Sequence, residues 1–316
     1  MDSCSPQIQA LLWLSSGDGD STTTVTTSTF LRQRYELALL FIQWGGPKWA
    51  ANVRWLSSHN ECTWFGLTCN DQQQVIAVAL PANSVTGRFS LNVATAGLAS
   101  SVQSLDLSWN KLQGNIILTN NNSMNGSEMS FGGQYSNLTS LVLDNNQLNG
   151  TIPSELGMLL IGLQELSISF NQITGTVPSE LGMLVALTDL SLASNYLQGW
   201  IPTTLGRLTN LRSVELSNNA ALSGQLPSEI GSWHAIQSMS LQYNSLIGTI
   251  PTQVGLLSQL TSLSLEHNGI NGSIPTELYQ LSHTMVQFSA DHNELSGTIS
   301  TLVGNMVQMS KSRSLQ

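Results

Sequence analysis

Residues 187–202 read LTDLSLASNYLQGWIP, and this stretch decides the fold of the chain. Apolar and polar residues alternate in its first half, which is typical of a short strand with one buried face. Asn195 follows at a turn, where its side-chain amide can satisfy backbone groups. Gly199 permits a positive φ, and Pro202 cannot donate in a strand ladder, so we expect the return path of the chain to begin there.

The pattern Leu-x-x-Leu-x-Leu-x-x-Asn recurs in register along the chain. Its anchoring asparagines are Asn83, Asn110, Asn146, Asn171, Asn195, Asn219, Asn244, Asn268 and Asn293. Seven of the eight intervals between them are 24, 25 or 27 residues, and the interval of 36 after Asn110 indicates an insertion. Because no single copy can bury its leucines alone, stacked copies must build one continuous core. We therefore predict an α/β solenoid of about nine repeats, whose strands form a parallel sheet on the concave face.

Four copies place a hydroxyl residue and a glutamate directly after the proline. These pairs are Ser154-Glu155, Ser179-Glu180, Ser228-Glu229 and Thr276-Glu277. A hydroxyl residue that caps a helix, with Glu in the first turn, is typical of a helix start. We therefore expect a short capped helix on the convex side of each such repeat.

Charged residues make up only 9% of the 316 residues, and the formal net charge is −9. This balance argues against a nucleic-acid partner, because a phosphate backbone requires patches of Lys and Arg. No run of about 18 apolar residues occurs, so a membrane would be reached only through a segment outside this chain. No signal peptide is visible, so either the protein is cytosolic or its targeting segment also lies outside the chain.

Catalytic motifs are missing from the sequence. No glycine-rich phosphate loop leads from a strand into a helix, and no nucleophile elbow occurs, so we predict no enzymatic activity and no cofactor. His267 and His292 fall in the same column of adjacent repeats, with Glu266 and Asp291 beside them. These residues suit a metal ion or a pH switch, but two surface histidines are the simpler interpretation, and we predict no metal site.

The repeat resembles the plant-type leucine-rich repeats of receptor-like kinase ectodomains, polygalacturonase inhibitors and related algal surface proteins. The distinguishing segment, Leu-x-Gly-x-Ile-Pro, is best seen in LNGTIP at 148–153. The resemblance covers residues 75–299 and implies a right-handed superhelix. It also implies that 300–316 are a C-terminal tail or a degenerate cap.

Residues 62–69 read CTWFGLTC and are similar to the Cys-x-Trp-x-Gly-x-x-Cys signature of that family's N-terminal cap. The resemblance implies a helical cap over 1–74 and a disulfide between Cys62 and Cys69. The pair could instead form half of a metal site, but no second Cys/His pair has a suitable spacing. Cys4 is the third cysteine and has no partner in this pairing.

We expect helices at Ser5–Leu14 and about Leu31–Gln43. Four tryptophans should seal the open end of the leucine core: Trp44, Trp49, Trp55 and Trp64.

Two sets of residues are candidates for ligand binding on the concave face. The position before each anchor asparagine holds Trp109, Asn145, Phe170, Ser194, Asn218, Tyr243, His267 and His292. Acids at nearby strand positions are Asp106, Asp144, Glu215, Glu266 and Asp291, with Glu165 and Asp189 close by and Arg212 as the opposing base. The aromatic and imidazole rings either contact a ligand or lean onto neighbouring strands. The acids either steer a cationic ligand or form a solvated polar face.

The insertion spans about 118–136 and is rich in Asn, Ser and Gly, which predicts a surface loop. Glycosylation sequons begin at Asn121, Asn125, Asn137, Asn149 and Asn271. Turn chemistry alone explains the last two, and in a secreted protein we expect glycan on at least one of the five.

The sequence favours an extracellular or cell-surface recognition module that binds a protein, peptide or polysaccharide, in receptor-type signalling or defence. Two alternatives stay open: a soluble inhibitor of a cell-wall-degrading enzyme, and a structural or adhesive surface protein. The sequence leaves the ligand, the oligomeric state and the role of Cys4 undetermined.

Overall fold

The computed structural model describes residues 5–16, 28–89, 98, 101–116 and 137–297. The chain forms two compact units, Met1–Asn149 and Gly150–Gln316, which we describe separately. Several predictions fall outside the described residues: the insertion at 118–136, the sequons at Asn121 and Asn125, Cys4, and the tail at 300–316.

The first unit begins with two helices, α1 (Pro6–Ser15) and α2 (Ser28–Gln43). The hydroxyl of Ser5 caps α1, as its position before Pro6 suggests. The second helix begins at Ser28, three residues before the predicted start at Leu31. Two short 3-10 turns follow, η1 (Gly46–Lys48) and η2 (Glu61–Thr63). Trp44 and the first repeat are joined by a hydrogen bond from the amide of Thr86 to the carbonyl of Trp44, 3.1 Å long. The role of this segment as a cap stays a prediction.

Two sheets form in the first unit. One contains β1 (Leu67–Cys69), β2 (Val75–Ala79), β4 (Ser104–Asp106) and β6 (Ser140–Val142), and the other contains β3 (Thr86–Arg88), β5 (Lys111–Asn115) and β7 (Gln147–Thr151). All pairs are parallel except β1 with β2, which are antiparallel. The sequence pattern did not predict this exception. It arises because the turn at 70–74 joins β1 directly to β2 as a hairpin.

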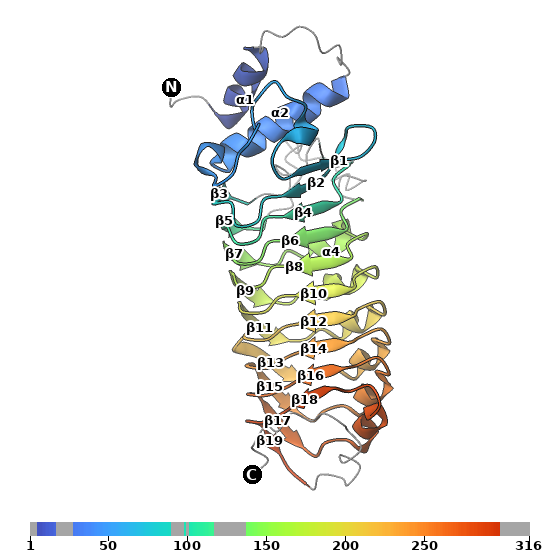
Figure 1. The fold of residues 1–316 in the computed structure, drawn as a ribbon. Helices are drawn as coiled ribbons and strands as arrows, with labels where there is room; N and C mark the ends of the chain where they lie inside the picture. The colour runs from blue at the N-terminus through green and yellow to red at the C-terminus, as the bar shows by residue number, and fades with distance from the viewer. Residues whose placement is uncertain (1–4, 17–27, 90–97, 99–100, 117–136, 298–316) are drawn as a thin grey trace, which may run out of the picture. The chain divides into compact units, whose positions relative to one another are not determined.

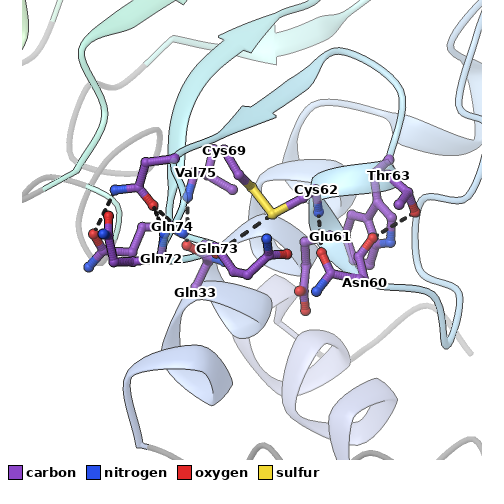
Figure 2. The surroundings of a disulfide bond; sticks show 12 residues. Gln33, Asn60, Glu61, Cys62, Thr63, Cys69, Gln72, Gln73, Gln74 and Val75 are labelled. Atoms are coloured by element: carbon purple, nitrogen blue, oxygen red, sulfur yellow. Dashed lines mark hydrogen bonds between the residues drawn. A yellow bond between two sulfur atoms is a disulfide. The ribbon is translucent and has the colours of Figure 1, made fainter.

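The Cys62–Cys69 disulfide predicted from the family resemblance is present, with 5.5 Å between the two Cα atoms (Figure 2). Gln33 of α2 ties the neighbouring hairpin to the helix. Its Nε2 donates to the carbonyl of Gln73 at 3.2 Å, and its Oε1 accepts from the amide of Val75 at 2.9 Å. The disulfide therefore lies where a helix, a 3-10 turn and the first strand meet.

The four tryptophans predicted to seal the core are all buried. Trp55 contacts Trp49 and Trp64, with ring centroids 5.0 and 5.2 Å away. Arg34 extends over the ring of Trp64 at 5.6 Å and forms a 3.0 Å ion pair with the largely buried Glu61. A buried charge needs such a partner, so Arg34 and Glu61 fix the turn that contains Cys62.

Replacing both Cys62 and Cys69 with Ser should lower the free energy of unfolding of the first unit by about 2.5 kcal/mol, the loop-entropy value for so short a closed loop. Urea titrations followed by near-ultraviolet circular dichroism of the tryptophan cluster would measure the change. Reduction of the wild-type chain should reproduce it, while the double variant should be insensitive to reductant. Equal stability of the oxidised wild type and the variant would contradict the prediction.

The second unit repeats one motif six times, and its strands stack in chain order in two parallel sheets (Figure 1). The first sheet contains β8 (Glu165–Ser167), β10 (Asp189–Ser191), β12 (Ser213–Glu215), β14 (Ser238–Ser240), β16 (Ser262–Ser264) and β18 (Gln287–Ser289). The second contains β9 (Gln172–Thr176), β11 (Tyr196–Trp200), β13 (Ala221–Gln225), β15 (Ser245–Gly248), β17 (Gly269–Gly272) and β19 (Glu294–Leu295). The central residues of the first-sheet strands are apolar, in register, as in the pair Leu190 and Val214, and buried. The solenoid and its parallel sheet are confirmed. The second sheet was not predicted.

The anchor asparagines turn the chain as predicted and also join consecutive repeats. The buried amide of Asn195 donates to the carbonyl of Leu192 at 3.2 Å within its own repeat. It also donates to the carbonyl of Ile168 at 3.0 Å and accepts from the amide of Ile173 at 3.0 Å, both in the preceding repeat. Asn195 therefore satisfies buried backbone groups of two repeats at once, and Asn219 does the same one repeat later.

Short turns form the return path of the second unit. They are α4 (Glu155–Leu159), η3 (Ser179–Met183), η4 (Thr203–Arg207), η5 (Ser228–Ser232), η6 (Thr252–Leu256) and η7 (Thr276–Leu281). The predicted hydroxyl caps are wrong. Ser179 does not cap η3 but bonds the carboxylate of Glu180 at 3.1 Å. The carbonyl of Pro178 accepts the amide of Leu181 instead, because a 3-10 turn this short closes through its backbone.

Candidate functional site

The residues before the anchor asparagines share an unusual backbone conformation. We call them the turn column: Trp109 and Asn145 in the first unit, and Phe170, Ser194, Asn218, Tyr243, His267 and His292 in the second. All eight have φ between +54° and +58°. They lie just beyond the strands of the first sheet, not within them as the strand register implied. Gly, Asn and Asp tolerate this left-handed region, whereas it is disfavoured for large side chains.

Aromatic residues at this position are therefore not explained by backbone preference. Trp109 of the first unit is 66% exposed, and in the second unit Phe170 is 57% and Tyr243 is 48% exposed. A large ring costs free energy here twice, once through the backbone and once through exposure of apolar surface. Such an outlier is a reason to infer a functional constraint.

Three rings of the turn column stack in consecutive repeats. The ring of His267 lies 4.4 Å from that of Tyr243 and 4.0 Å from that of His292, between centroids, and the planes are within 14° of parallel. For these three residues the rings contact the neighbouring repeats, which is one of the two arrangements that the sequence predicted. The other was contact with a ligand. Phe170 is more exposed than Tyr243, as a ligand-contacting residue would be.

The predicted acids of the second unit line the same face. Asp189 and Glu215 are exposed, and they accept hydrogen bonds from hydroxyls, from Thr188 at 2.7 Å and Ser191 at 3.2 Å. Glu165, Glu266 and Asp291 are half-buried on neighbouring repeats. Arg212 is exposed beside them. The face therefore carries a net negative charge. In the first unit, Asp106 and Asp144 are half-buried, and Asp106 accepts a hydrogen bond from the amide of Ser108 at 2.9 Å.

Sequence reasoning missed two further exposed aromatics in the second unit. Tyr196 and Trp200, both on β11, are 65% and 69% exposed. Trp200 borders two open grooves of about 770 and 480 Å³, the smaller of which is lined only by uncharged residues. The signal was available, because both residues occupy strand positions that alternate with the buried Leu197.

Three predicted glycosylation sites lie within the described residues. Asn137, Asn149 and Asn271 are all exposed, and glycosylation at these sites stays a prediction. Among the helices that the structure describes, none combines the length and apolar character needed to cross a membrane.

Comparison with known families identifies the repeat. Two models described as leucine-rich repeat match the chain, one at residues 161–220 and the other at 137–159 and 259–281. The chain is a plant-type leucine-rich-repeat protein. No curated protein sequence matches this leucine-rich-repeat protein.

Two of the solved structures that are similar to this chain are plant receptors. The ectodomain of the Arabidopsis thaliana receptor kinase GASSHO1/SCHENGEN3, in complex with CASPARIAN STRIP INTEGRITY FACTOR 2, is 33% identical with a TM-score of 0.68. The Arabidopsis receptor kinase HAESA, in complex with the peptide hormone IDA and the co-receptor SERK1, is 32% identical with a TM-score of 0.70. These matches cover 81% and 80% of this chain but only 29% and 40% of the two receptor chains.

Proposed function

We propose that this protein is an extracellular recognition module that binds an extended peptide along the turn column of its second unit. The observation that carries the proposal is the presence of exposed aromatic rings at left-handed backbone positions, where neither folding nor solubility favours them. Exposed, rigid aromatic side chains are common anchors of binding energy in interfaces.

The spacing of the anchors fits a peptide. Phe170 and Tyr243 are three repeats apart, which is about 15 Å along a sheet with normal strand spacing. An extended chain covers that span in about four or five residues. The exposed carboxylates of Asp189 and Glu215 belong to the two repeats between these anchors. The favoured ligand therefore has two apolar side chains about four residues apart, with Lys or Arg between them.

The similar receptors support this proposal. HAESA was solved with a peptide hormone, and the GASSHO1/SCHENGEN3 structure is of an ectodomain. The Cys62–Cys69 disulfide supports an extracellular location, because disulfides persist in oxidising compartments.

A random peptide library displayed on phage should yield binders with the apolar–basic–apolar pattern. A chemically synthesised binder should then lose at least about thirtyfold in affinity for the Phe170→Ala/Tyr243→Ala variant, the effect expected when interface hot spots are truncated. Its affinity should also fall as salt is raised, since part of the attraction is between exposed charges.

Trp200→Ala is the matched control, because it removes a ring that is even more exposed from the other sheet of the same unit. The proposal requires that this variant bind as the wild type does. Selected peptides that depend on Trp200 and not on Phe170 or Tyr243 would move the site to the second sheet and refute it.

A further inference from the structure

The last two described repeats bring two histidines and an aspartate together. His267 follows β16 and His292 follows β18, and these strands pair in parallel register with Leu263 opposite Phe288. The register continues past the strands, because the amide of His267 donates to the carbonyl of Asp291 at 3.0 Å. The shared left-handed backbone then directs both imidazoles to the same side, where they stack.

The side chain of Asp291 completes the cluster. Its Oδ2 lies 2.8 Å from Nδ1 of His292. One ligand atom each from His267, Asp291 and His292 can be chosen so that all three lie within 4.8 Å of one another. Two imidazoles and a carboxylate are a donor set that binds Zn²⁺ in sites with an open fourth position.

The geometry points to a Zn²⁺ site formed by His267, Asp291 and His292. With metal–ligand bonds of about 2.0 to 2.2 Å, ligand atoms of a tetrahedral site lie roughly 3.4 Å apart. The longest separation here must therefore shorten by at most about 1.4 Å. Rotation of the His292 side chain, which is 59% exposed, can provide that movement without displacing the backbone.

A second observation favours a cation at this place. Oε2 of Glu266 and Oε1 of Gln242 are buried, and neither has a hydrogen-bond partner among the described residues. Gln242, Glu266 and Asp291 occupy equivalent positions of three consecutive repeats, each directly before a ring of the stack. Buried acceptors without a donor are unfavourable, and a nearby positive ion offsets that cost. The charge of Glu266, the residue before His267, therefore adds to that of Asp291 in favouring a divalent cation on this face.

Isothermal titration of Zn²⁺ into the untagged full chain, with free thiols alkylated to remove Cys4 as a ligand, tests the site. We expect one Zn²⁺ per chain. The His267→Gln/His292→Gln variant should bind at least about a hundredfold more weakly, because loss of two ligands should exceed the 10- to 100-fold effect of losing an outer-shell partner. Asp291→Asn should weaken binding to a smaller extent.

The matched control is His234→Gln/His283→Gln, which removes two exposed histidines of the same unit that lie outside the cluster. This variant should bind Zn²⁺ like the wild type. Cobalt substitution provides an independent measurement, since four-coordinate Co²⁺ gives intense visible absorption that should vanish in the His267/His292 variant. Absence of Zn²⁺ binding, or equal loss in the two double variants, would overturn the site. The peptide proposal is tested without metal and stands or fails separately.

Discussion

Replacement of Asn219 by Ala is expected to lower the free energy of unfolding by about 3 to 5 kcal/mol, because buried groups that lose a partner cost about 1 to 3 kcal/mol each. Asn219 is completely buried. Its Oδ1 accepts from the amide of Leu197 at 3.0 Å, and its Nδ2 donates to the carbonyls of Leu192 and Leu216 at 3.1 Å each. Alanine replaces none of these bonds.

Equilibrium urea unfolding, followed by tryptophan fluorescence, to which the buried Trp233 contributes, would measure the change. Gln198→Ala is the control, since this exposed side chain lies on β11 in the adjacent repeat and a surface truncation should change stability by less than about 0.5 kcal/mol. Hydrogen exchange should locate the loss at Leu197 and its neighbours. A variant as stable as the wild type would show that the asparagine column does not hold the repeats together.

The repeat period carries most of the information about the fold. Once Asn195 and Gly199 are aligned with their counterparts, the strand, the turn and the return path follow, and the observed φ of +77° at Gly199 agrees with the reason for placing glycine there. These features are predictable because each depends on contacts within one repeat or between identical neighbours. Strand β1 precedes the first repeat, so the period gave no information about its antiparallel pairing with β2.

The candidate site was predictable as a set of residues but not as an arrangement. The register placed Tyr243, His267 and His292 in one column, and the rings do lie there. Their stacking depends on a left-handed backbone at each position, which the residue types alone do not indicate, because a bulky residue such as Tyr disfavours it. In the structure, Tyr243, His267 and His292 thus form one cluster, and Phe170 is a separate exposed residue.

Gly157→Ala is expected to destabilise the protein by about 3 to 4 kcal/mol, even though alanine favours helices by about 1 kcal/mol over glycine. A Cβ at Gly157 in α4 would meet the carbonyl carbon and oxygen of Glu180 and approach the amide nitrogen of Leu181 to 2.8 Å. These are backbone atoms of the next repeat, so no side-chain rotation can relieve the overlap, and the two repeats must separate.

Gly269→Ala provides the comparison, because its Cβ would lie 3.3 Å from the carbonyl oxygen of Leu246, a distance that a small adjustment accommodates. We expect a change below about 1 kcal/mol there, within the range of well-tolerated substitutions. Urea unfolding of both variants decides whether helix propensity or the close approach of successive turns determines the effect of Gly157→Ala. If Gly157→Ala were as stable as Gly269→Ala, helix propensity would dominate at Gly157. A loss confined to Gly157→Ala means that the close approach of successive turns sets the spacing of the repeats, and with it the spacing of the turn column that we propose binds the ligand.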